Sequence, residues 1–251
     1  MIWDCFTFMN ELDILKIRCE ELSGLDITHV LVEANKTFTG KDKEFIFFKN
    51  RDLFKQYNIT SPRYHFASIG NIAWDNETTQ RNAIAKTLEY QKAKDDDWVI
   101  ISDVDEIIKK EAIEKYNPSM GLTALQMDVF WYKLNFLAEK GTWLLPRILT
   151  YLEFKKSTPD NIRRSGYPSV INDAGWHFSY IGDEDFIINK IQSFSHQEYN
   201  TPEFTNSELI KTKIQNGESL WGNSVFKKIE IDETFPSYLY NNQSEFKHLI
   251  A

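Results

Sequence analysis

The stretch Trp98–Glu106, which reads WVIISDVDE, places a short apolar run directly before three acidic residues. The run has the composition of a buried β-strand, and in an open α/β sheet ligands bind where strands end at their carboxyl edge. We therefore expect Asp103 and Asp105 to lie at the mouth of a crevice. Carboxylates at positions i and i+2 suit a hard divalent cation, which in turn neutralises the phosphates of a substrate. The pattern favours metal-dependent nucleotide chemistry.

An alternative is that these acids only cap a helix that begins near Ile107, which is a common role for aspartate. One acid would be enough for a cap, and residues 95–97, all aspartate, already place charge just upstream. Glu106, the third acid of the stretch, fits this alternative best.

The overall composition is that of an ordinary globular protein. Of the 251 residues, 42% are hydrophobic and 14% aromatic, which is enough for one large α/β domain with a filled core. The formal charge of −8 argues against nucleic-acid binding, which needs a basic surface. Cys5 and Cys19 form no metal-spaced pair and fit buried positions. Without a basic leader or an apolar run of about 18 residues, we expect a soluble, cytoplasmic protein.

Strand-like and helix-like patterns alternate through the first half of the chain. Apolar residues recurring every third or fourth position predict an amphipathic helix over residues 12–22, closed by Ser23-Gly24. In chain order, the other expected elements are strands at 2–8, 28–33 and 63–69, a helix at 76–94, the acid-bearing strand at 98–103 and a helix at 109–116.

The second half is less regular. Residues 122–134 resemble a long strand or hairpin arm, and 139–175 suggest strands joined by loops. Helices are predicted at 183–194 and 206–216, the latter ended by Gly217 in the left-handed conformation. Together these patterns predict a single α/β domain with a doubly wound, mostly parallel but mixed central sheet flanked by helices.

With these elements placed, the chain resembles glycosyltransferase family 17, the family of the bisecting β-1,4-N-acetylglucosaminyltransferases and their bacterial and viral relatives. The resemblance rests on blocks in the order of the family, which together span roughly residues 3 to 200. They are DCFTFMNELD at 4–13, VEANKTFTG at 32–40, QRN at 80–82, ISDVDEI at 101–107, GWHFSY at 175–180 and SFSHQE at 193–198. Ile108 departs from the proline of relatives, and we expect no signal-anchor of the kind found in the Golgi enzymes.

The resemblance implies a GT-A type fold, a UDP-sugar donor such as UDP-N-acetylglucosamine, a divalent cation (Mn²⁺, or alternatively Mg²⁺), and transfer with inversion to a glycan or glycoconjugate acceptor. It further implies a nucleotide-sugar-binding half at residues 1–117 and an acceptor-side half at 118–251. The acceptor, the linkage and the oligomeric state do not follow from the sequence.

For the metal we predict Asp105 as the principal ligand, with Asp103 directed at the ribose or at metal-bound water. His177 and His196 are further candidates, because GT-A enzymes often recruit a late histidine. The alternative for each histidine is a hydrogen-bonded position in the core.

For the donor we predict contacts from charged and aromatic residues near the strand ends. Arg81 can bind a diphosphate bidentately, and Glu33 can accept hydrogen bonds from uridine or ribose. Asp4 and Phe6 are expected at the base pocket, and Trp176 as a stacking platform for a sugar. The alternatives are a solvated arginine, a loop cap for Glu33, and burial in the core for the aromatic residues. Arg147 and Arg164 are further possible phosphate or acceptor contacts.

For the general base we predict a carboxylate on the acceptor side, separate from the metal acids. Asp185 is the first choice, followed by Glu184 and Asp173, because GDED at 182–185 precedes a helix and resembles the acid-bearing motif of many GT-A enzymes. The alternative is that these acids stabilise the N-terminus of that helix.

Three rival functions remain at this point. The same scaffold can transfer a different sugar, or it can bind a nucleotide or glycan without catalysis. A haloacid-dehalogenase-type phosphatase also carries Asp-X-Asp after a strand. That chemistry, however, places the nucleophile on the first strand and a Thr or Val where this chain has Ile107.

Overall fold

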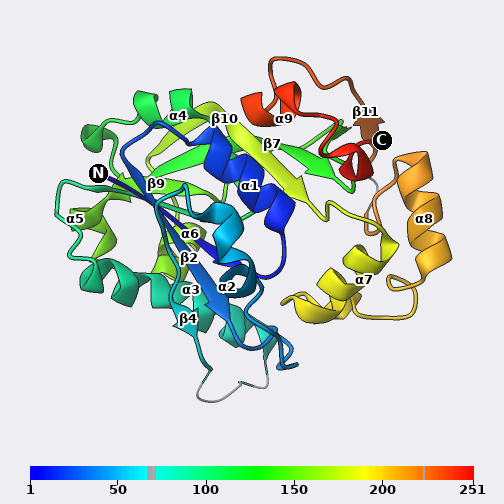
Figure 1. Cartoon of the computed structure of the whole chain (residues 1–251), viewed down its shortest axis with the longest axis horizontal. Helices are drawn as coiled ribbons and strands as arrows, with labels where there is room; N and C mark the ends of the chain where they lie inside the picture. The colour runs from blue at the N-terminus through cyan, green and yellow to red at the C-terminus, as the bar shows by residue number, and fades with distance from the viewer. Residues whose placement is uncertain (67–69, 71, 223) are drawn as a thin grey trace.

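The computed structural model describes residues 1–66, 70, 72–222 and 224–251 (Figure 1). They form one α/β domain around a mixed sheet of eleven described strands, with helices on both faces. The longest pairings are parallel: β1 (Ile2–Phe8) lies between β2 (Ile27–Ala34) and β5 (Trp98–Asp103), and β7 (Thr123–Trp131) pairs with β10 (Ser169–Ser179). The predicted fold class is confirmed.

Alternation of side chains along the central strands separates the two faces of the sheet. Val99 and Ile101 of β5 join the core beneath α3 (Ala73–Tyr90) and α6 (Pro159–Arg164), whereas Ile100 faces the opposite side. The same period directs Asp103 toward α3 and α6, and directs Ser102 toward α1 (Leu12–Glu21). The sheet therefore decides which helix each polar residue at the strand end meets.

A tight turn at residues 104–105 joins β5 to β6 (Glu106–Ile108), which pairs antiparallel with β10. Gly175 of β10 makes this pairing possible. A Cβ at Gly175, where φ is +155°, would lie 2.0 Å from the carbonyl oxygen of Ile107. The close approach brings His177 opposite Glu106 and therefore next to Asp105.

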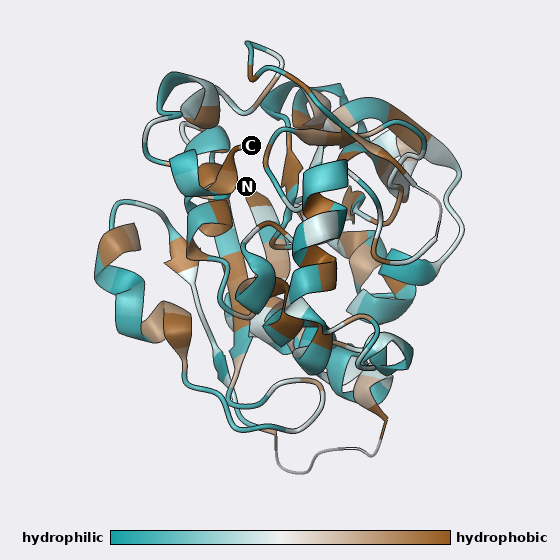
Figure 2. Cartoon of the chain, turned by 90° about the vertical axis from the view of Figure 1, so that its right-hand side faces the viewer, coloured by the Kyte–Doolittle hydropathy of each residue, from teal (hydrophilic) through white to brown (hydrophobic). Residues whose placement is uncertain are grey.

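The remaining elements extend the sheet or cover it. The strands are β3 (Ile59–Thr60), β4 (Arg63–Tyr64), β8 (Phe136–Ala138), β9 (Arg147–Thr150) and β11 (Phe226–Lys228). The helices are α2 (Ile46–Asn50), α4 (Lys110–Lys115), α5 (Tyr151–Phe154), α7 (Glu184–Ser193), α8 (Ser207–Asn216) and α9 (Ser237–Asn241), with 3₁₀ turns at Arg51–Phe54, Pro118–Met120, Gln197–Tyr199 and Lys247–Leu249. Hydrophobic and hydrophilic residues alternate around the helices (Figure 2).

Several predicted boundaries need correction. The strand predicted at 63–69 is the two-residue β4, and its part at 67–69 lies outside the described residues. The stretch 139–175, predicted as strands and loops, contains α5 and α6; α6 begins with Pro159 after Thr158, whose side chain accepts a hydrogen bond from the N–H of Asn161. Gly217 ends α8 with φ +64°, as predicted. Across the described residues, every helix is too short or too polar to cross a membrane.

Candidate active site

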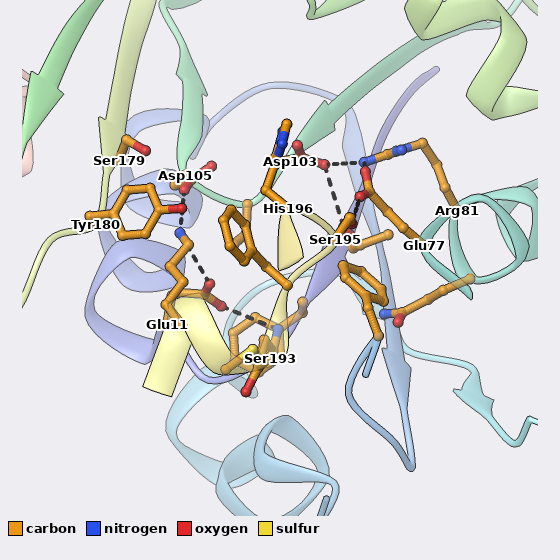
Figure 3. Close-up of a pocket in the computed structure, with 18 of the residues that line it drawn as sticks. Glu11, Glu77, Arg81, Asp103, Asp105, Ser179, Tyr180, Ser193, Ser195 and His196 are labelled. Atoms are coloured by element: carbon orange, nitrogen blue, oxygen red, sulfur yellow. Dashed lines mark hydrogen bonds and ion pairs between the residues drawn. The ribbon is translucent and has the colours of Figure 1, made fainter. Parts of the chain in front are cut away.

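A cleft of about 450 Å³ opens where β1 and β5 end at the carboxyl edge of the sheet. Its lining comes from both halves of the chain: from the ends of β1 and β5 and from α3, and from α6, β7, β10, α7 and residues 194–199. In Figure 3, Asp105, Tyr180 and Glu11 lie on one side of the cleft, and Asp103 and Arg81 lie on the other. Asp103 and Asp105 of the stretch Trp98–Glu106 thus line one cleft, as predicted.

Asp103 is held by two arginines. Arg81 of α3 donates to Oδ1 at 2.9 Å, and Arg163 of α6 donates to Oδ2 at 2.6 Å. Arg163 also donates twice to Glu106, at 2.7 and 2.6 Å, and Arg81 donates to Glu77 at 2.7 Å. We call Asp103, Glu106, Arg81 and Arg163 the arginine cluster. Both oxygens of Asp103 are engaged, so it is poorly placed to be a metal ligand.

Burial opposes ionisation of Asp103, but the positive charges of Arg163 and Arg81 outweigh it and hold the pKa of this carboxyl below its usual range. The same pairing raises the pKa of Arg163, against the effect of its burial. The carboxyl of Asp103 and the guanidinium groups around it therefore stabilise each other in their charged forms.

Glu106 does not cap a helix. It is fully buried, accepts a 2.7 Å hydrogen bond from the N–H of Asp103 and is also bonded by the indole N–H of Trp143. The next helix, α4, begins only at Lys110 and has no side-chain cap. The capping alternative for the acidic stretch is wrong, because the chain continues as β6 after the turn.

Asp105 has a different environment. Lys190 of α7 donates to Oδ2 at 2.9 Å, and Nε2 of His177 lies 3.8 Å from Oδ1. The ammonium group of Lys190 also lies 3.8 Å from Oε1 of Glu11, whose other oxygen accepts the backbone N–H groups of Met9 and Asn10. We call Asp105 and Lys190 the lysine pair. Together with Glu11 it carries a net charge of −1.

His177 completes this side of the cleft. Its ring stacks on Trp143 with centroids 4.3 Å apart, and its Nδ1 is buried without a hydrogen-bond partner among the described residues. Burial lowers the pKa of His177 although Asp105 acts in the opposite direction. Burial also opposes charge on Lys190, but Asp105 and Glu11 raise its pKa overall. The cleft thus offers a carboxylate, a neutral imidazole and an ammonium group.

Aromatic side chains form a further part of the cleft, here called the aromatic wall. Tyr199 and Trp221 stack with centroids 4.5 Å apart and planes 11° apart, and Trp131 lies 5.2 Å from Trp221. Tyr180 and Phe194 complete the wall. The sequence pattern does not indicate this wall, because its residues converge from four separate segments of the chain.

His196 lies in the cleft, in contact with Trp74 and paired with Glu198 at 2.6 Å. Arg164 also lines the cleft and pairs with Asp160 at 2.9 Å. Arg147 is instead buried, donating to backbone carbonyls that include Ser165 at 3.1 Å.

Asp4 and Phe6 lie beneath the cleft and do not line it. Asp4 is fully buried and binds Arg18 at 2.8 Å and His29 at 2.7 Å, while the Arg18 guanidinium lies 4.4 Å from the Phe6 ring centre. Arg18 in turn donates to the carbonyls of Asp103 at 3.1 Å and Glu106 at 2.6 Å. The structure therefore does not bring Asp4 and Phe6 to the cleft, where the base was predicted; both support Arg18, which fixes the backbone of the acidic turn.

Glu33 and Trp176 also point elsewhere. Glu33 is fully buried and accepts the N–H groups of Phe47 at 3.0 Å and Phe48 at 3.3 Å, at the start of α2. Trp176 follows the alternation of β10, so it faces away from His177, and its indole N–H donates to the carbonyl of Thr234 at 3.2 Å. The capping and burial alternatives hold for these two residues.

The predicted base residues are not brought to the cleft. Asp185 is exposed in the first turn of α7, next to Glu184, and Asp183 caps that helix by accepting the N–H of Phe186 at 2.9 Å. Asp173 is exposed, has a φ of +52° and pairs with Lys109 beside a separate small cavity. Asp173, Glu184 and Asp185 all fall outside the described lining of the cleft, because they lie at the parts of β10 and α7 that are away from it.

The residues around Asp105 fit a divalent ion that is bound together with a diphosphate. Within the described residues, no three His, Cys, Asp or Glu side chains converge as a ready-made metal cage. Ions that bind substrate phosphates commonly take only one or two protein ligands, and phosphates and water complete the shell. The oxygen of Asp105 and the nitrogen of His177 are suitable donors for this arrangement.

The cleft lies at the carboxyl edge of an α/β sheet, the place where such sheets bind ligands, and it is lined by acids, cations and aromatic rings. The sequence model of glycosyltransferase family 17 matches residues 1–251. The chain therefore belongs to glycosyltransferase family 17 and is a glycosyltransferase. A search of curated proteins found no match.

Proposed function

We propose that this glycosyltransferase has a GT-A type fold, requires a divalent metal ion, preferably Mn²⁺, and transfers N-acetylglucosamine from UDP-N-acetylglucosamine to a glycan acceptor with inversion. The observation that carries the proposal is the lysine pair with His177 in the cleft of a family 17 chain. No other part of the described cleft combines an unshared carboxylate oxygen, an imidazole nitrogen and a cation.

The chemistry needs positive charge at the leaving group. Negative charge grows on the diphosphate as the glycosidic bond breaks, and preorganised cations stabilise it. A divalent ion held by Asp105 and His177 supplies part of that charge when bound. Arg81 and Arg163 orient Asp103 and fix the turn that carries Asp105, so in this proposal their role is positional.

In this proposal both halves of the chain contribute to the donor site. Residues 1–117 contribute Asp105 and the end of β1, and residues 118–251 contribute His177 and Lys190 beside Asp105, so we place the diphosphate between them. Residues 118–251 contribute the aromatic wall, and the apolar face of a pyranose ring suits such a surface. We place the acceptor sugar at Tyr199 and Trp221.

An inverting transfer also needs a base that takes the proton of the acceptor hydroxyl. Besides the two aspartates, the described cleft is lined by the carboxylates of Glu11 and Glu77. Glu77 is bonded by Arg81 at 2.7 Å and also by Ser195. Both glutamates are at hand in the cleft, whereas Asp185 is exposed outside it, so we propose that one of the two is the base.

A donor screen by UDP release tests the proposal. The protein is incubated with a panel of UDP-sugars, with MnCl₂ or with EDTA, and with mixed glycan acceptors. We expect the fastest release from UDP-N-acetylglucosamine with Mn²⁺ and background release with EDTA. NMR of the product then reports the anomeric configuration, and a product with the α configuration would refute inversion. Equal release with EDTA would refute the metal requirement.

The same assay on Glu11→Gln and Glu77→Gln identifies the base. Loss of transfer with retained UDP binding assigns the role to that residue, because a base is needed only for the chemical step. If both variants transfer at the wild-type rate, neither glutamate is the base.

A further inference from the structure

Lys190 is the one cation lining the described cleft that bonds directly to Asp105. Its side chain is 16% exposed, and the ammonium group lies 2.9 Å from Oδ2 of Asp105. Ile187 and Ile191 of the same helix are buried. They fix the orientation of α7, so that the side chain of Lys190 points toward the cleft. An ammonium group therefore already occupies one oxygen of the carboxylate that the proposed metal needs.

The other cations at the cleft are committed elsewhere. Arg81 and Arg163 each contact two or more acids, and Lys43 lies 3.3 Å from Glu33. Arg164 pairs with Asp160 outside the strand-end turn. None of these groups contacts Asp105, whereas Lys190 has Asp105 as its close partner at 2.9 Å and Glu11 as a more distant one at 3.8 Å.

Lys190 can leave Asp105 without becoming stranded. Glu11 lies 3.8 Å from the ammonium nitrogen, and the face of Tyr180 lies 5.2 Å away. Lysine is a point charge on a flexible stem, which makes such a move easy. Glu11 already accepts two backbone N–H groups, so it is only a partial replacement for Asp105.

We propose that Lys190 is an exchangeable cation: it pairs with Asp105 while the cleft is empty, and contacts the donor diphosphate once a divalent ion takes Asp105. This inference rests on the proposed metal-dependent use of a nucleoside-diphosphate donor. Lys190 then has two opposite effects. It competes with the ion for Asp105 in the absence of donor, and it adds positive charge to the diphosphate when the donor is bound.

Calorimetric titrations of Lys190→Met test both effects without any turnover. The first titration adds MnCl₂ alone, and the second adds UDP at saturating MnCl₂. Relative to wild type, we expect Mn²⁺ to bind about tenfold more tightly and UDP to bind about tenfold more weakly, since each exchange involves one short ion pair. Changes of opposite sign distinguish this role from a structural one, which would weaken both or neither.

Matched variants control for folding and for charge. Lys213→Met removes a lysine paired with Glu218 at 3.0 Å on α8, outside the described lining of the cleft, and we expect both affinities to stay at wild-type values. Lys190→Arg retains a cation and is expected to restore UDP affinity. If Lys190→Met does not fold, Lys190→Gln, which still donates to Asp105 but carries no charge, is titrated in its place with the same expectations.

The possible results separate the two proposals. Unchanged or weaker Mn²⁺ binding in Lys190→Met, or unchanged UDP binding, overturns the exchange. Wild-type protein that binds UDP equally with EDTA and with MnCl₂ also overturns it, while leaving a nucleotide-dependent transferase in place. Wild-type protein that binds no UDP under either condition overturns the proposed function itself.

Discussion

Asp103 and Asp105 are two residues apart and line one cleft, yet their carboxylates have different partners. In the arginine cluster, both oxygens of Asp103 are bonded by buried guanidinium groups at 2.9 and 2.6 Å. In the lysine pair, Asp105 has one ammonium partner at 2.9 Å and a histidine at 3.8 Å. The comparison shows that two acids at an Asp-X-Asp spacing can have different partners: Asp103 is bound on both oxygens by arginines, whereas Asp105 is bound by a lysine on one oxygen only.

The largest effect is expected from Asp105→Asn. Removing this charge removes the principal proposed metal ligand, so we expect transfer to fall by about a thousandfold, the order produced by losing several kcal/mol of leaving-group stabilisation. Thermal unfolding is expected to change by no more than about 4 °C, because Lys190 keeps Glu11 as a partner. UDP release and differential scanning calorimetry measure the two quantities. Near-wild-type transfer would remove Asp105 from the proposed site.

For Asp103→Asn we expect the loss of folding stability, rather than the loss of transfer, to be the main effect. The variant leaves Arg81 and Arg163, whose side chains are only 2% and 4% exposed, without one of their partners. Breaking such a buried pair costs about 3 kcal/mol or more. Urea unfolding of wild type and variant gives the difference. A loss below about 1 kcal/mol would mean that the arginine cluster does not depend on Asp103.

The pH dependence of stability sharpens the same contrast. The pKa of Asp103 is lowered in the folded state, where Arg163 and Arg81 outweigh its burial, and an unperturbed aspartate titrates near about 3.9. Its stabilising contribution is therefore complete above that pH and is lost as the pH falls through the folded value. We expect the unfolding free energy of Asp103→Asn to fall less steeply than that of wild type between about pH 4 and pH 2. Parallel curves would contradict the assignment.

A smaller effect is expected on the acceptor side. Trp221→Ala removes one of the two stacked rings of the Tyr199–Trp221 pair, whose side chains are uncharged. We expect the KM for the acceptor to rise by about tenfold, as for the loss of one aromatic contact, while UDP affinity stays unchanged. Initial rates at varied acceptor concentration give the KM. An equal loss of UDP affinity would place Trp221 at the donor instead.

The sequence pattern predicts the central part of this fold well, because the spacing of apolar residues along each strand and helix matches the face that the element buries in the core. The strands at 2–8 and 98–103 and the helix at 12–22 are found within a residue or two, since their apolar residues repeat with the period of the element. The cleft at the end of β5 follows from the same argument. The burial of polar residues at that edge cannot be predicted in the same way. Arg18 is an example, because its partners are Asp4 and the backbone of the distant acidic turn.

The residues that the sequence pattern misplaces or misses are set by long-range packing. Trp176 and His177 are neighbours in the sequence, but the pleat of β10 sends them to opposite faces. Arg163 reaches Asp103 from α6, which lies in the stretch predicted as strands joined by loops, although Thr158-Pro159 is a helix-start pattern. Lys190 lies in a correctly predicted helix, yet only the packing of α7 against the cleft gives it Asp105 as a partner.

The smallest effect is expected from Asp185→Asn, and it tests the sequence-based choice of base directly. Asp185 is exposed in the first turn of α7, where a negative charge favours the helix by about 0.3–1 kcal/mol through the helix dipole. We therefore expect a slight drop in thermal stability and a transfer rate within about twofold of wild type, a difference too small to reflect loss of a catalytic proton acceptor. Single-turnover transfer at saturating donor provides the measurement. If transfer is lost while UDP still binds, α7 must bring Asp185 to the acceptor during the reaction, and neither glutamate of the cleft is then needed as the base.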